Sequence, residues 1–159
     1  MINKDLLILE RLNSSLQKCS MHLNRLHYAS SQVYRLFPLT SETYYTLSEA
    51  TIGNIDQLIY RFTKLQDEIG NNSFRLLLEY LQEDIADKPF RDILNILERL
   101  NIIESVDTWL SLRELRNDLA HEYPELIGET INKLNHLYLQ LPHLENILTI
   151  IKLKVDKSE

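Results

Sequence analysis

The chain has 159 residues, 44% of them hydrophobic, and a formal net charge of −6. This length and composition predict a single globular domain, which we expect over residues 1–154, followed by a charged tail at 155–159. Affinity for nucleic acid comes largely from cations that neutralise phosphates, so an acidic chain is not expected to coat RNA. Any contact with RNA must therefore be confined to a local cluster of Arg and Lys.

Several features favour the cytoplasm over a membrane or an oxidising compartment. No apolar run approaches the roughly 18 residues that a membrane-spanning helix needs, so we expect no membrane partner. The first five residues lack the basic and apolar regions of a secretory signal. The one cysteine, Cys19, cannot form an internal disulfide. These features predict a cytoplasmic protein.

Apolar residues recur at spacings of three and four along most of the chain, which predicts amphipathic helices. Pro38 should end the first helix, and Thr40 offers an N-cap for the second. The cluster Gly70–Ser73 is typical of a turn and cap, and Asn101 of a helix end. In chain order, the predicted helices cover residues 3–36, 41–69, 74–86, 90–100, 105–123 and 125–154.

Two prolines bear on the last two predicted helices. Ser105 is a candidate N-cap, and the helix that follows it should end near Tyr123, because Pro124 disfavours α conformation in the residue before it. Pro142 should kink or interrupt the final helix. We find no convincing strand or second domain. The sequence therefore predicts an all-α, up-and-down bundle of about five to six helices.

The segment 116–123 reads Arg-Asn-Asp-Leu-Ala-His-Glu-Tyr and holds most of the chemistry. Successive helical residues advance by about 100°, which sorts the predicted helix into three faces. One face is apolar and should be buried; it holds Trp109, Leu112, Leu115 and Leu119. A second is an acidic line that should be solvated: Glu114, Asp118 and Glu122. The third contains no acid, and consists of Arg113, Arg116, Asn117, Ala120 and His121.

The third face has the groups that metal-independent RNA cleavage needs. Arg116 can hold phosphate oxygens with a fixed fork of donors, with Arg113 as a second cation. His121 can move a proton near neutral pH, and Asn117 can orient either the imidazole or the phosphate. Tyr123 can donate a hydrogen bond or serve as a modification site. The simpler interpretation is a polar helix face with an N-terminal salt-bridge partner elsewhere.

Other chemistries have little support in the sequence. The three glycines form no phosphate-binding loop, and the remaining histidines show no metal-ligand spacing. We therefore expect no metal and no cofactor. One chain carries one motif histidine, so a two-fold homodimer that brings two motifs together would double the set of groups.

The pattern Arg-x4-His-x-Tyr, with Asn directly after Arg, resembles the signature of the HEPN superfamily, and in particular HepT-like RNase toxins of toxin–antitoxin systems. The segment 60–70 is also similar to small HepT-like proteins. This resemblance implies a helical homodimer with both motifs in a shared cleft, Arg116 and His121 as the catalytic pair, and Asn117 assisting. It also implies a nucleotidyltransferase antitoxin as partner, RNA as substrate, and Tyr123 as a candidate for AMPylation.

Two alternatives remain open from the sequence. The first is a non-catalytic HEPN module that serves as the substrate- or nucleotide-binding partner of a minimal nucleotidyltransferase. The second is a purely structural helical protein. The presence of Arg, Asn, His and Tyr together favours the RNase, because a binding module has less need of all four groups.

Overall fold

The computed structural model describes residues 3–121 and 127–158. Helices and their connections make up the described part, without strands, and the prediction of an all-α bundle is confirmed. In chain order the elements are α1 (Lys4–Val33), η1 (Tyr34–Leu36), α2 (Ser41–Tyr45), α3 (Glu49–Glu68), η2 (Ile69–Ser73), α4 (Phe74–Tyr80), α5 (Phe90–Arg99), α6 (Val106–Ala120) and α7 (Ile127–Ser158).

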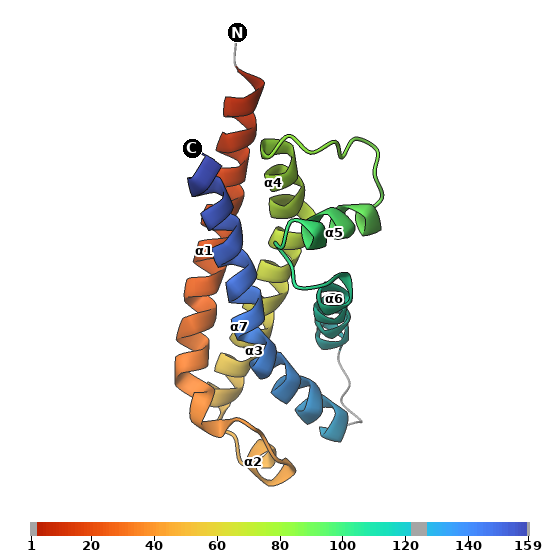
Figure 1. Cartoon of the computed structure of the whole chain (residues 1–159). Coiled ribbons are helices and arrows are strands. Elements are labelled where there is room, and N and C mark those ends of the chain that lie inside the picture. The colour runs from red at the N-terminus through yellow and green to blue at the C-terminus, as the bar shows by residue number, and fades with distance from the viewer. Residues whose placement is uncertain (1–2, 122–126, 159) are drawn as a thin grey trace.

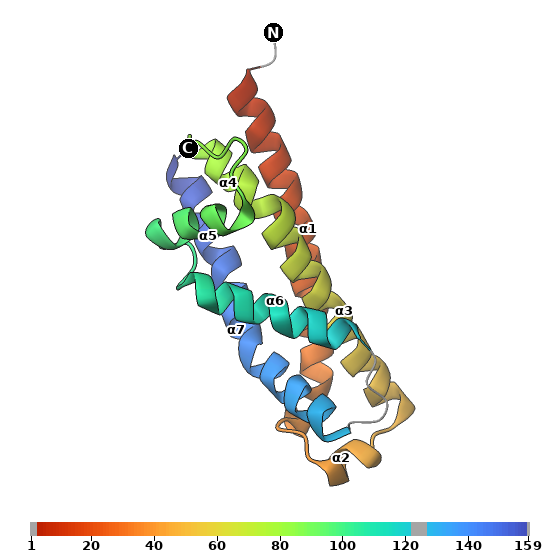
Figure 2. The ribbon, with the colours of Figure 1, turned by 90° about the vertical axis from the view of Figure 1, so that its right-hand side faces the viewer.

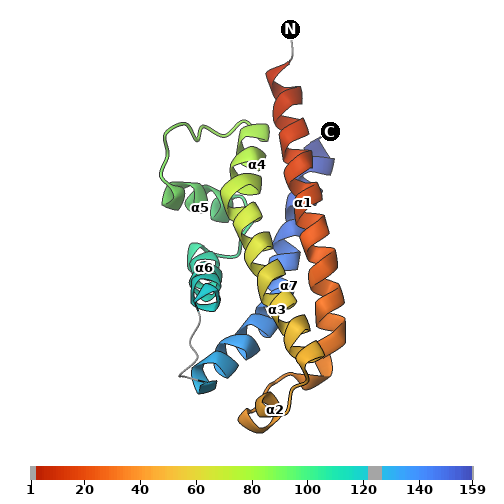
Figure 3. The ribbon, with the colours of Figure 1, turned by 180° about the vertical axis from the view of Figure 1, so that it is seen from behind.

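Helices α1, α3 and α7 form an elongated body, with α4 continuing α3 towards the end where both termini lie (Figures 1 and 3). The α1 and α3 helices run in opposite directions and pack along much of their length. The α6 helix lies across α3 and α7 rather than alongside them (Figure 2). This crossing presents one face of α6 to the core and leaves the rest at the surface.

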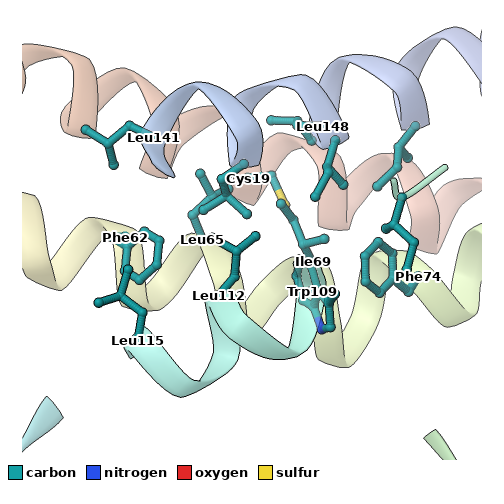
Figure 4. Close-up of a cluster of buried hydrophobic side chains, with 14 of the residues drawn as sticks. Cys19, Phe62, Leu65, Ile69, Phe74, Trp109, Leu112, Leu115, Leu141 and Leu148 are labelled. Carbon is teal, nitrogen blue, oxygen red and sulfur yellow. The ribbon is translucent and has the colours of Figure 1, made fainter. Parts of the chain in front are cut away.

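The core lies where α6 meets α3, η2 and α7 (Figure 4). Trp109 and Phe74 are almost completely buried and pack edge to face, with ring centroids 4.6 Å apart. Leu112 and Leu115 on α6 extend the same apolar face towards Phe62. Burial of large side chains at this crossing fixes where the remaining faces of α6 point.

The predicted helix over 41–69 is in fact two helices. Helix α2 ends at Tyr45, and α3 begins after Ser48, whose hydroxyl accepts a hydrogen bond from the Thr51 amide at 3.2 Å. Thr40 caps α2 in the same way, by accepting from the Thr43 amide, as predicted. The second cap explains the break, because Ser48 adopts an extended conformation that ends one helix and starts another.

The turn predicted at Gly70–Ser73 was wrong. These residues continue α3 into α4 as the π-helical segment η2, in which the Phe74 amide donates to the Ile69 carbonyl. Ser73 is completely buried, and its hydroxyl lies 2.7 Å from that of Ser15 on α1. Tertiary contacts therefore hold in the helix a segment whose composition alone favours a turn.

The helix predicted over 74–86 was too long, since α4 ends at Tyr80 and Gln82 has a φ of 63°. The next helix was placed correctly, as α5 covers Phe90–Arg99. Asn101 follows its end with a φ of 59°, the left-handed conformation expected of a residue at a helix terminus.

Of the two effects expected of Pro142, a kink or an interruption, the interruption does not occur. Pro142 lies inside α7, and α7 changes direction along its length (Figure 1). Helix α7 continues to Ser158, into the segment predicted as a charged tail, and Val155 is only 3% exposed. Across the described residues, no helix is both long and apolar enough to cross a bilayer.

Candidate functional site

The start and the buried face of α6 follow the sequence closely. The Ser105 hydroxyl accepts a hydrogen bond from the Thr108 amide at 3.0 Å, so Ser105 is the predicted N-cap. Trp109, Leu112 and Leu115 are buried as expected, whereas Leu119 is only partly buried. The buried stripe directs Arg113 and Asn117 to the surface and leaves Arg116 partly covered.

Arg116 forms a bidentate ion pair with Asp67 on α3. Its Nε donates to Oδ1 at 2.9 Å and its Nη2 to Oδ2 at 2.8 Å. These hydrogen bonds raise the pKa of Arg116 above its ordinary value, so the guanidinium stays charged. A guanidinium has five N–H donors, so the edge formed by Nη1 and the second hydrogen of Nη2 remains for other acceptors. The Nη1 group also makes a long contact, 3.5 Å, to Oδ1 of Asn117.

Arg116 and Asp67 border a small cavity of about 220 Å³ between α3, η2, α5 and α6, which we call the polar pocket. Its other cation is Arg113, whose guanidinium lies 5.1 Å from the ring centroid of Phe90. The residues that line the polar pocket are Gln66, Asp67, Gly70, Asn71, Phe90, Trp109, Arg113, Arg116 and Asn117. The pocket thus gathers three of the five predicted site residues.

Trp109 lines the polar pocket and carries a polar group that the sequence analysis did not consider. The side chain is 1% exposed, yet its Nε1 has no hydrogen-bond partner among the described residues. In Figure 4 this nitrogen lies at the end of the ring turned away from α7. A buried N–H without a partner costs about 1–3 kcal/mol, so an acceptor that reaches it would stabilise the protein. The only other such nitrogen in the described part is Nε of Arg61.

Gly70 allows the indole to sit where it does. A Cβ atom on Gly70 would lie only 2.9 Å from Cζ2 of Trp109, well inside van der Waals contact. The glycine therefore serves a close approach of ring and helix backbone, rather than the turn that its neighbours suggested.

His121 lies apart from the polar pocket. Helix α6 ends at Ala120 instead of near Tyr123, and His121 is its C-cap in an extended conformation, with its amide donating to the Asp118 carbonyl at 3.3 Å. The imidazole is exposed and lines a separate cavity of about 600 Å³ between α6, α3 and the start of α7. The α-helical alignment of Asn117 and His121 that we expected does not extend to residue 121.

The other predicted features have mixed outcomes. Asp118, expected in a solvated acidic line, is partly buried and lies 3.6 Å from the ammonium of Lys133 on α7. Tyr123 and Glu122 lie outside the described residues. Among those described, no three His, Cys, Asp or Glu side chains gather as they would around a metal ion.

Sequence reasoning missed Asp67 and Trp109 as members of the site. Asp67 is 49 residues from Arg116, and no spacing rule links two residues that far apart. The indole N–H was hidden by the apolar periodicity of Trp109, which correctly indicates burial. Comparison of the chain with protein-family models, with curated proteins and with solved structures gives no match in any of the three.

Proposed function

We propose that the protein is a metal-independent endoribonuclease of the HEPN type that acts as the toxin of a cytoplasmic toxin–antitoxin module. The observation that carries the proposal is the grouping of Arg116, Arg113 and Asn117 around one pocket, on the helix that ends next to His121. Three groups that can hold a phosphate and one imidazole that can transfer a proton thus lie on one short stretch of chain.

In the proposed reaction, the imidazole of His121 takes the proton of an RNA 2′-hydroxyl, and the 2′-oxygen attacks the adjacent phosphorus. The bond from phosphorus to the 5′-oxygen breaks, and that oxygen takes a proton from an acid, for which the second motif of a dimer supplies another histidine. The products are a 2′,3′-cyclic phosphate and a 5′-hydroxyl. Arg116 stabilises the negative charge that builds up on the phosphate oxygens.

The proposed active form is a homodimer. Within one chain, Arg116 and His121 line different cavities, so a cleft between two copies would bring the groups of both motifs to one RNA strand. The exposed Ala120 at the end of α6 leaves room for a second helix to approach. Light scattering should give twice the chain mass at micromolar concentration, and a strict monomer would contradict the shared cleft.

The proposed partner is a nucleotidyltransferase antitoxin that adds AMP to Tyr123. A phosphodiester next to Arg113 and Arg116 would occupy the donors that RNA needs. Co-expression with this partner should add one or more AMP masses to the chain and abolish cleavage. The same mass added to a Tyr123→Phe variant would show that another residue is modified.

The second candidate is a non-catalytic module that binds the substrate or nucleotide of a minimal nucleotidyltransferase. The ion pair with Asp67 favours this candidate, because the nearby carboxylate weakens the ability of Arg116 to stabilise the negative charge that builds up during cleavage. The two candidates separate in a cleavage assay with purified protein and labelled RNA in EDTA. The RNase should cleave and the His121→Ala variant should not, whereas the binding module would leave RNA intact in both forms.

A further inference from the structure

The polar pocket has the features of a site for one small anion. Its lining has two guanidinium groups and one carboxylate, a net charge of +1 on a chain whose net charge is −6. The carboxylate of Asp67 is engaged through both oxygens with Arg116. Positive charge is therefore concentrated at this pocket while the protein as a whole is acidic, which would attract an anion to this place in particular.

The donors that remain point to an oxyanion. The indole N–H of Trp109 can donate but not accept, and it lacks a partner among the described residues. Arg113 makes no ion pair with a described carboxylate and rests over Phe90, which leaves its N–H groups available. Arg116 can donate from Nη1 and from the second hydrogen of Nη2. A cation would be repelled by both guanidinium groups and would find no ligand in the indole.

We infer that the polar pocket binds a phosphate group, held by the indole N–H of Trp109 and the guanidinium groups of Arg113 and Arg116. A cavity of about 220 Å³ is large enough for a phosphate and too small for a whole nucleotide with its base. The phosphate is therefore the part inserted, and the rest of the ligand lies outside. The absence of a Cβ atom at Gly70 is what allows the indole to lie at this position.

This inference deepens the proposed function and rests on it for the source of the phosphate, which can be the backbone of RNA or the terminal phosphate of a nucleotide. The site itself does not depend on His121, which lines a different cavity. Phosphate binding and RNA cleavage can therefore be tested separately.

The protein offers a direct probe, because Trp109 is its single tryptophan and gives the single indole N–H resonance. The whole chain, labelled with ¹⁵N, should be titrated with inorganic phosphate, and with chloride at matched ionic strength. We expect the indole resonance to shift and saturate with phosphate in about the millimolar range, and not with chloride. If water alone fills the pocket, the resonance will not respond to phosphate, and the inference is overturned.

Two variants make the titration specific. Arg113→Gln should weaken phosphate binding by about tenfold, as expected for loss of one charge-assisted contact. Arg99→Gln is the matched control, because Arg99 is an exposed cation of α5 that pairs with Glu83 and does not line the pocket. The affinity of this variant for phosphate should equal that of the wild type. Equal weakening in both variants would show a general charge effect and would contradict the site.

Two further ligands identify the source of the bound phosphate. One is a 2′-O-methyl RNA oligonucleotide, which cannot be cleaved by 2′-hydroxyl attack, and the other is AMP. A shift at lower concentration with the oligonucleotide assigns the pocket to the RNA backbone, and one with AMP assigns it to a nucleotide; no shift with either contradicts the inference. The His121→Ala variant separates phosphate binding from RNA cleavage, because it should still bind phosphate and should not cleave RNA. If the wild type binds phosphate and never cleaves RNA, the proposed function is wrong and the phosphate site remains.

Discussion

The carboxylate of Asp67 on α3 holds the guanidinium of Arg116 on α6 through two hydrogen bonds, at 2.9 and 2.8 Å. Both side chains are about one-third exposed, so the pair contributes modestly to stability, roughly 0–1 kcal/mol for a partly solvated pair. Its larger effect is geometric. It restricts the rotation of Arg116, which lines the polar pocket, and leaves one edge of the guanidinium outside the pair.

Replacement of Asp67 by Asn should separate positioning from charge. Without the bidentate acceptor, Arg116 regains its freedom, and we expect kcat for RNA cleavage to fall about tenfold or more, since misplaced transition-state contacts are costly. The KM should stay the same or fall, because a negative charge has been removed near the RNA. Glu83→Gln, which breaks the surface pair with Arg99, is the control. A rise in kcat for Asp67→Asn would instead identify Asp67 as an inhibitor of Arg116.

The two helical glycines Gly70 and Gly53 should respond in opposite directions to alanine. At Gly70 the added Cβ meets Trp109 at 2.9 Å, so we expect a loss of about 1–3 kcal/mol in the free energy of unfolding, typical of overpacking. At Gly53 nothing lies within 4 Å, and alanine should stabilise α3 by about 0.5–1 kcal/mol. Urea unfolding of both variants measures this. Equal stabilisation by the two would contradict the close packing of the indole.

The free energy of unfolding should decrease as the pH is lowered, and part of this decrease should depend on His22. Burial and the nearby Arg61 lower its pKa below 6.5, Lys64 and Arg25 lower it slightly further, and Glu68 acts in the opposite direction. The Nδ1 atom lies 3.0 Å from Nη1 of Arg61 and can accept its hydrogen bond only while the imidazole is neutral.

Because the pKa of His22 is lower in the folded than in the unfolded state, the unfolded state binds more protons as the pH drops through about 6.5. The contribution of His22 is therefore present above that pH and is lost below it. His22→Gln, which can still accept from Arg61, should show a smaller loss of stability between pH 7.5 and pH 5. An unchanged pH profile in this variant would refute the assignment.

The thiol of Cys19 should be inert in the folded protein. Burial raises its pKa to about 11, and its sulfur lies 3.5 Å from the Ser73 hydroxyl in the contact between α1 and η2. A thiol reagent at pH 8 should react only as denaturant unfolds the chain, since both the thiolate and access to it are lacking. Rapid modification in native buffer would show that α1 and η2 separate in the folded state.

Regular features of the fold could be predicted from the sequence, and context-dependent ones could not. The apolar periodicity and the Ser105 cap placed α6 correctly at its start, because both act locally. The segment Gly70–Ser73 was mistaken for a turn, since the contacts that keep it helical come from Ser15 and Trp109, far away in the chain. Such tertiary contacts override local propensity without leaving a signal in spacing.

The same distinction applies to the candidate site. The faces of α6 correctly grouped Arg113, Arg116 and Asn117, which line one pocket. The simpler interpretation, a polar helix face with a salt-bridge partner elsewhere, agrees with the ion pair between Arg116 and Asp67. His121 was placed on the same face only because the helix was extended too far. The end of α6 at Ala120 depends on backbone geometry that a wheel of side chains does not represent.

The most direct test of metal-independent RNA cleavage is an assay on labelled RNA in the presence of EDTA, with wild type, His121→Ala and Arg116→Lys compared at equal helicity by circular dichroism. We expect cleavage by the wild type with 2′,3′-cyclic phosphate ends, none by His121→Ala, and loss of most activity in Arg116→Lys, because a single ammonium cannot replace the guanidinium fork. Cleavage that requires added magnesium, or that persists at the wild-type rate in His121→Ala, would contradict it.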